Sequence, residues 1–217
     1  MLAVWNPVVN RVLPAAWYVP ANLSVAAALV ALARRGGATW VELGVDRTAA
    51  PAGLRLGAKV AVVVGAVIGL GAVLPSTRSF FADARYRDLS AAGLAYQALV
   101  RIPLGTVVLE ELAFRGVLPA VFARSMSVRK AVAASSTLFG LWHILPTLSA
   151  ATANDLSSGL AGRVGLVAGA VGATTVAGVL FCGLRLRSGS VVAPMLAHTA
   201  TNSLGVVVAF TVLRRQP

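Results

Sequence analysis

Residues 89–116 read LSAAGLAYQALVRIPLGTVVLEELAFRG. A helix needs about 20 apolar residues to cross a bilayer, and residues 89–109 have that length with one charge, Arg101. The seven residues that follow carry two carboxylates and a guanidinium, Glu110, Glu111 and Arg115. A charged side chain at the bilayer centre costs about 3 kcal/mol even on the mildest scale, so charges in a span indicate a functional site by default. The competing interpretation of this stretch alone is a solvated charge cluster at a helix end on the membrane surface.

The spacing of the three charges predicts different surroundings for the two glutamates. On a helix, Glu111 and Arg115 lie four residues apart on one face and are close enough to pair. Glu110 points about 100° away and shares its face with Phe114. We therefore expect Glu111 to be neutralised by Arg115 and Glu110 to be left without a charged partner.

The composition is that of a polytopic membrane protein. The 217 residues are 58% hydrophobic and 12% charged, whereas a soluble domain carries about 25% charge. The net charge of +12 comes from 19 Lys and Arg, mostly in short gaps between apolar runs, which favours anionic lipid as a partner over nucleic acid. The single Cys182 excludes an intramolecular disulfide and a cysteine-based metal site. The first charge in the chain is Arg11, so the N-terminus has no basic region before its apolar stretch and we expect no cleaved signal peptide.

Charge-poor runs predict about six spans, and we expect them at 12–33, 60–77, 89–109, 131–154, 164–184 and 188–213. The fold class is therefore all-α, a polytopic transmembrane helix bundle. We interpret 1–217 as a single membrane domain, with two spans and a linker in 1–88 and a core in 89–213. Within the first run, Pro14, Pro20 and Asn22 predict an interfacial lead-in.

Three details of this assignment concern where helices begin, end and pack. Residues 36–59 form a polar linker that we expect outside the hydrocarbon. The third span would deliver Glu110 and Glu111 at or near its end, and Pro119 would then break or kink the helix. The pairs Gly65/Gly69 and Gly165/Gly169 have the spacing that lets helices approach closely in lipid.

Both histidines lie inside predicted spans, where an imidazole needs a polar partner that hydrocarbon cannot supply. His198 and Asn202 are four residues apart on one helix face, and so are Phe139 and His143. Together with the Glu110 region, three spans each present polar side chains to the bundle interior. We expect these side chains to converge.

The three segments resemble a known family. EELAFR at 110–115, FGLWH at 139–143 and HTATN at 198–202 are similar, in order, to the three motifs of the CPBP family (CAAX protease and bacteriocin-processing). This family of intramembrane proteases includes the type 2 CAAX prenyl endopeptidase. The resemblance covers roughly 89–208 and implies an intramembrane endopeptidase. It also implies catalytic roles for Glu110, His143, His198 and Asn202, with Glu111 and Arg115 as structural support.

The chemistry of peptide hydrolysis gives these residues expected tasks. Glu110 would take a proton from water and return it to the leaving nitrogen, and His143 would hold and polarise that water. By the resemblance, His198 and Asn202 would line the site and donate to the oxyanion. Glu110, His143 and His198 are also a possible zinc ligand set, but we favour no metal and no cofactor, because using Glu110 as a ligand leaves no evident general base.

Two functions of other classes compete with a protease. A proton-coupled transporter could use the glutamate and histidines as proton carriers, although we find none of the repeats that transporters show. A scaffold or immunity protein could keep the fold and act by binding other membrane proteins. For a protease, we expect membrane-embedded or lipid-anchored peptides as substrates and, from the Ala-, Arg- and Val-rich composition, a bacterial cytoplasmic membrane.

Overall fold

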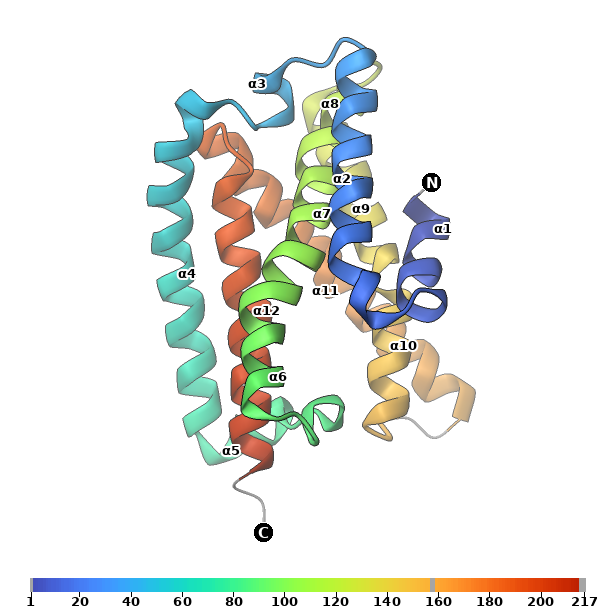
Figure 1. The fold of residues 1–217 in the computed structure, drawn as a ribbon, viewed down its shortest axis with the longest axis vertical. Helices are drawn as coiled ribbons and strands as arrows, with labels where there is room; N and C mark the ends of the chain where they lie inside the picture. Colours follow the sequence, from blue (N-terminus) through green and yellow to red (C-terminus); the bar gives the residue numbers. More distant parts are fainter. Residues whose placement is uncertain (1, 157–158, 215–217) are drawn as a thin grey trace.

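The computed structural model describes residues 2–156 and 159–214, and this part of the chain is helical, with no strand. Six helical stretches are long and apolar enough to cross a membrane: Ala15–Arg35, Arg47–Val73, Ala91–Phe122, Val128–Ala153, Gly159–Ser188 and Val192–Leu213. They stand roughly side by side in Figure 1 and form an all-α bundle. The number of spans expected from the sequence is thus confirmed, while several boundaries differ.

The chain begins with a short helical segment that runs antiparallel to the first span (Figure 1). It consists of α1 (Leu2–Pro7) and a wider π-helical turn, η1 (Val8–Val12). The chain then turns at Pro14 and passes through η2 (Ala15–Trp17) into α2 (Tyr18–Arg35). The segment is part of the bundle, because Trp5 Nε1 donates a hydrogen bond to Asn22 Oδ1 at 2.6 Å.

The linker after the first span is shorter than expected. It contains α3 (Trp40–Leu43) and η3 (Arg47–Ala49), and α4 already begins at Ala50 and continues to Val73. Pro51 stands in the first turn of α4, where its missing N–H costs nothing, and the helix continues through Arg55 and Lys59. Residues 50–59 thus belong to α4, and the expected placement of 36–59 outside the hydrocarbon stays a prediction. Long basic side chains near a helix end can reach the membrane surface, so their charges do not end the span.

The second and third spans are joined by a loop of short helical turns, α5 (Pro75–Arg78), η4 (Ser79–Phe81) and η5 (Ala84–Tyr86). The third span then begins at the N-cap Ser90, whose side chain accepts a hydrogen bond from Gly93 N at 3.0 Å. It runs without interruption through five segments, α6 (Ala91–Tyr96), η6 (Gln97–Val107), α7 (Val108–Glu111), η7 (Leu112–Val117) and α8 (Leu118–Phe122).

The two glutamates lie inside this third span and not at its end. The helix continues through Pro119 to Phe122, so the expected end near Leu109 was wrong and Pro119 does not break the helix. The alternative expectation, a kink at Pro119, stays a prediction. The segments η6 and η7 are π-helical, with wider turns than an α-helix. Such turns occur often at functional sites.

The fourth span is divided at His143 into α9 (Val128–Trp142) and α10 (Ile144–Ala153). The last two spans, α11 (Gly159–Ser188) and α12 (Val192–Leu213), are continuous helices. Close approach depends on small residues: a Cβ on Gly57 would lie 2.9 Å from the backbone of Ala193, and one on Gly140 would lie 2.7 Å from the carbonyl oxygen of Val171. Gly140 of the FGLWH segment thus lets α11 pack against α9.

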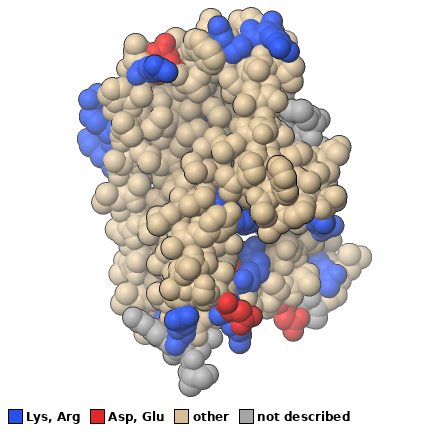
Figure 2. All heavy atoms as spheres, in the orientation of Figure 1, with Lys and Arg blue, Asp and Glu red and all other residues tan. Residues whose placement is uncertain are grey.

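The charge distribution agrees with a bundle whose long axis crosses the membrane. In Figure 2 the Lys and Arg side chains gather mainly toward the two ends of the face shown, and most of the band between them is uncharged. A hollow in the lower half of this face exposes further basic side chains. The protein is therefore an integral membrane protein with a polar opening within an otherwise apolar bundle.

Candidate active site

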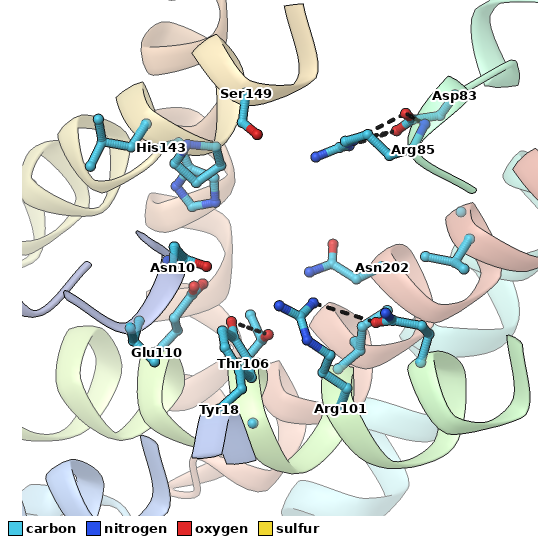
Figure 3. A pocket seen from close by; sticks show the side chains of 18 of the residues that line it. Asn10, Tyr18, Asp83, Arg85, Arg101, Thr106, Glu110, His143, Ser149 and Asn202 are labelled. Carbon is cyan, nitrogen blue, oxygen red and sulfur yellow. Dashed lines mark hydrogen bonds and ion pairs between the residues drawn. The ribbon is translucent and has the colours of Figure 1, made fainter. Parts of the chain in front are cut away.

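A cavity of about 820 Å³ lies in the bundle. Its wall combines residues from the N-terminal segment, from α2, from the third and fourth spans, from α12 and from the loop at 80–86. Figure 3 shows Glu110, His143, Arg101 and Asn202 around this space. Three of the four residues expected to be catalytic, Glu110, His143 and Asn202, therefore line one cavity although they lie on three spans.

Glu110 has one carboxylate oxygen bound and one without a partner. The Trp142 indole Nε1–H donates to Glu110 Oε1 at 2.9 Å. The other oxygen, Oε2, is buried and makes no hydrogen bond to the described residues. Its neighbour is His198, whose Nε2 lies 3.8 Å away. Glu110 is therefore held in place but keeps an oxygen available to accept a proton.

Glu111 lies in a different network behind the cavity wall. Arg115 Nη1 donates to its Oε1 at 3.0 Å, and His198 Nδ1 is bonded to the same oxygen at 2.7 Å. Both Glu111 and Arg115 are almost completely buried. The ion pair expected from the helical spacing is thus present, and His198 joins it as a third member.

Arg115 is stabilised by aromatic rings as well as by Glu111. Its guanidinium carbon lies 3.9 Å from the ring centroid of Phe139 and 5.0 Å from that of Phe181. Its Nε and Nη2 are buried without a hydrogen-bond partner among the described residues. Stacking on these ring faces offsets part of the cost of burying the cation.

His198 connects the two glutamates. Its Nδ1 contacts Glu111 and its Nε2 faces Glu110, so an imidazolium could donate toward both. His198 is not among the residues that line the cavity, so it lies behind Glu110.

His143 lies at the junction of α9 and α10 and is oriented by the backbone. Its Nδ1 is 2.8 Å from the carbonyl oxygen of Phe139, and its ring packs edge-on against Phe139 with centroids 4.5 Å apart. Because a carbonyl only accepts, Nδ1 carries the proton in this contact. In the neutral ring, Nε2 is then free to accept.

The sequence did not predict several polar side chains of this cavity. One of them is the indole of Trp142. In a sequence, a tryptophan beside a histidine indicates only helix packing, because the spacing does not show that its N–H bonds a carboxylate on another helix. On the opposite wall, Tyr18 and Thr106 share a hydrogen bond of 3.0 Å, and the guanidinium carbon of Arg101 lies 3.8 Å from the Tyr18 ring centroid. Arg101 was recognised only as a charge within a span.

The loop at the cavity is tied to the end of α10. Asn154 Nδ2 donates to Asp83 Oδ1 at 3.0 Å, Ala84 N donates to Asn154 Oδ1 at 2.7 Å, and Arg85 Nη2 pairs with Asp83 Oδ2 at 2.6 Å. Burial alone would raise the pKa of the Asp83 carboxyl, but the hydrogen bonds from Arg85 and Asn154 outweigh it and lower the pKa from its usual value. The loop is thereby fixed beside the cavity.

The three candidate zinc ligands do not form a ready ligand set. Among residues 2–156 and 159–214, no group of three or more His, Cys, Asp or Glu side chains is arranged to hold a metal ion. Glu110 Oε2 and His198 Nε2 lie 3.8 Å apart, and the contact of His198 Nδ1 with Glu111 leaves Nε2 toward Glu110. The expectation of a metal-free site stays a prediction.

Comparison with protein families identifies one match. The family model described as type II CAAX prenyl endopeptidase Rce1-like matches residues 92–204, which is more than half of the chain and includes the segments 110–115, 139–143 and 198–202. No curated protein and no solved structure matches the chain.

Proposed function

The chain belongs to the type II CAAX prenyl endopeptidase Rce1-like family, and from this premise we propose that it is a glutamate-dependent intramembrane endopeptidase. The family is one of CAAX-type membrane proteases, and the described part of the chain has six helices able to span a membrane. The observation that carries the finer proposal is the state of Glu110. It lines a cavity with His143 and Asn202 and has one carboxylate oxygen bound by Trp142 and one without a hydrogen-bond partner.

Glu110 acts as the general base and then as the general acid. Its unpartnered Oε2 accepts a proton from a water molecule, and the water oxygen attacks the scissile carbonyl carbon. The C–N bond then breaks, and the protonated Glu110 returns the proton to the leaving nitrogen. The hydrogen bond from Trp142 holds Oε1 and leaves Oε2 without a hydrogen-bond partner, so we assign the proton transfer to Oε2.

His143 orients the attacking water. Because its Nδ1–H is bonded to the Phe139 carbonyl, a neutral His143 presents Nε2 as an acceptor for the second hydrogen of that water. The backbone contact fixes both the tautomer and the plane of the ring. His143 thus provides position, and Glu110 takes the proton.

Asn202 is the donor best placed for the oxyanion, because it lines the cavity that Glu110 and His143 also line. Its side-chain amide donates to the carbonyl oxygen as negative charge develops. His198 supports the reaction from behind Glu110, with its Nε2 3.8 Å from Oε2. In this proposal His198 holds Glu110, while Glu111 and Arg115 hold His198 and the helix, and the oxyanion role expected for His198 is not kept.

We propose membrane-embedded or lipid-anchored peptides as substrates, because the cavity lies among membrane-spanning helices. A chain rich in Ala, Arg and Val is typical of bacteria, so we place the protein in a bacterial cytoplasmic membrane with anionic lipid around its basic ends. Protein prenylation is not expected there. A processed peptide or another membrane protein is therefore favoured over a prenylated one as the substrate.

The proposal is tested with purified protein and its Glu110→Gln variant, assayed against membrane-anchored and prenylated peptides. We expect cleavage by the parent and at least a roughly 10³-fold loss in the variant, because an amide cannot accept the proton. Asp88→Asn, which neutralises an exposed carboxylate, is the matched control and should leave cleavage unchanged. Cleavage by Glu110→Gln at the parental rate would contradict the mechanism, and binding without cleavage by the parent would favour a scaffold.

A further inference from the structure

The break in the fourth span leaves a backbone carbonyl without its helical partner. In an α-helix the carbonyl of residue i accepts from the N–H of residue i+4, and four residues after Trp142 stands Pro146, which has no N–H. The helix is interrupted here, with His143 N bonded to the Gly140 carbonyl and α10 starting at Ile144. A buried carbonyl without a donor costs about 1–3 kcal/mol, so the oxygen of Trp142 requires a partner from elsewhere.

Asn6 of the N-terminal segment is that partner. Its Nδ2 donates to the Trp142 carbonyl oxygen at 2.8 Å, and its side chain is 4% exposed. Asn10, one turn later, donates its Nδ2 to Asn6 Oδ1 at 2.9 Å. This second bond orients the Asn6 amide, because an oxygen that accepts from Asn10 leaves the Asn6 nitrogen to face Trp142.

The segment is held independently of Asn6. Trp5 donates its indole N–H to Asn22 of α2 at 2.6 Å, and Asn22 is 2% exposed. Val9 on the same segment is also buried. Docking of the segment and capping of the broken helix thus depend on different side chains and can be separated by mutation.

The capped carbonyl belongs to the residue whose side chain holds Glu110. The Trp142 indole donates to Glu110 Oε1, and the next residue in the chain is His143. A rotation of the backbone at this break would move both the indole and the imidazole. We propose that Asn6 is a positioning residue of the active site: it replaces the donor that Pro146 lacks and thereby fixes Trp142 and His143 relative to Glu110.

This assignment rests on the proposed function and adds a part of the chain outside the family match, which begins at residue 92. It makes Asn6, supported by Asn10, a component of the active site. The consequence is that the site is incomplete without the N-terminal segment, although the three motifs are all present without it.

The test compares Asn6→Leu with Asn6→Gln in the full chain. Leucine is close in size but has no donor, so we expect kcat to fall about 10- to 100-fold with KM within about twofold, as for a small misplacement of catalytic groups. Glutamine keeps the amide and should recover most of the parental kcat. Val12→Ala, an exposed position on the same segment, is the control and should change neither constant.

A readout that does not need activity is the indole N–H signal of each tryptophan in the NMR spectrum of ¹⁵N-Trp-labelled protein, with Trp142 assigned from a Trp142→Phe variant. In Asn6→Leu we expect the Trp142 signal to move and the Trp5 signal to stay, because the segment remains docked through Asn22. An unmoved Trp142 signal, or a kcat equal to that of the parent, would overturn the proposal. A shift of both signals would mean that Asn6 only docks the segment and would also overturn it.

The two proposals fail in distinguishable ways. If Glu110→Gln keeps its activity, the proposed function fails, yet the Trp142 signal still reports whether Asn6 fixes the break. If Glu110→Gln is inactive and Asn6→Leu retains both its kcat and its Trp142 signal, only the positioning role of Asn6 fails.

Discussion

Glu110 and Glu111 are neighbours in the chain but have opposite surroundings. The helical turn of about 100° directs Glu110 to the cavity and Glu111 to Arg115 and His198. Glu110 has a neutral donor, Trp142, on one oxygen, while Glu111 balances a buried cation. Two identical side chains can therefore serve different tasks, one chemical and one structural.

A Glu111→Gln substitution should act on stability. It leaves Arg115, which is 1% exposed, without its counter-charge, and breaking a buried ion pair from one side costs about 3–5 kcal/mol. We expect a lower thermal unfolding midpoint in detergent than for Glu110→Gln, which retains an acceptor for the Trp142 indole. Equal midpoints for the two variants would show that the division of tasks is wrong.

Asn202 offers a test of transition-state stabilisation. If its amide donates only as the oxyanion forms, Asn202→Ala should lower kcat by about 10²–10³ and leave KM nearly unchanged. An asparagine that merely joined helices would contribute about 1 kcal/mol to stability and little to turnover. Steady-state kinetics and thermal unfolding on the same preparation separate the two, and a lower midpoint with kcat within a few-fold of the parent would assign Asn202 to packing.

We further predict that the protease activity does not depend on a metal ion. With Glu110 as the base, cleavage should survive exhaustive chelation, and purified protein should contain no stoichiometric zinc by elemental analysis. Loss of activity on chelation with recovery specific to zinc would contradict this. It would transfer Glu110, His143 and His198 to the role of ligands.

At the level of helices, each proline leaves one backbone carbonyl without its N–H donor. A side chain from another helix then donates to that carbonyl. In a π turn the N–H of residue i+5 bonds the carbonyl of residue i, so Pro103 leaves Ala98 and Pro119 leaves Phe114 without that donor. Ser203 Oγ donates to the Ala98 oxygen at 2.7 Å, and Ser135 Oγ donates to the Phe114 oxygen at 2.6 Å. This is how membrane helices tolerate proline.

A Ser135→Ala substitution should show how much stability is lost when a buried backbone carbonyl has no strong hydrogen-bond donor. Ser135 is fully buried, and removing its hydroxyl leaves the Phe114 oxygen with only the weak contact from Cys182 Sγ at 3.9 Å. We expect a loss of about 1–3 kcal/mol in the free energy of unfolding. Thr152→Ala, which removes an exposed hydroxyl bonded within its own helix, is the control, and an equal effect of both variants would refute the idea.

The sequence predicted the helices better than their contacts. Apolar length predicted six spans, and the four-residue spacing predicted the Glu111–Arg115 pair, because both are local properties of one helix. Helix packing is not local: a Cβ added to Gly69, Gly165 or Gly169 would meet no neighbouring helix within 4 Å in the described part of the chain, while Gly57, in the presumed linker, lies against α12. The bond from Asn6 to Trp142 joins residues 136 positions apart, and no periodicity can predict it.

For the whole molecule, the position of the cavity determines from which side a soluble part of the substrate arrives. The lining includes Arg85 and Ser149, whose segments, η5 and α10, lie in the lower half of the bundle in Figure 1, where α12 also ends. Residues of the opposite end lie far from this wall. The membrane orientation therefore decides which compartment has access to the site.

The basic residues predict that orientation. The segments after the first, third and fifth expected spans, 34–59, 124–130 and 185–187, contain ten Lys and Arg, against seven in the N-terminal region, the two other loops and the C-terminal region. The positive-inside rule then places the ten in the cytoplasm, both termini outside and the cavity on the outer side. A C-terminal reporter that is active only outside the cytoplasm should give a signal. One that is active only in the cytoplasm should not, and a signal from it would reverse the orientation and open the cavity to cytoplasmic substrates.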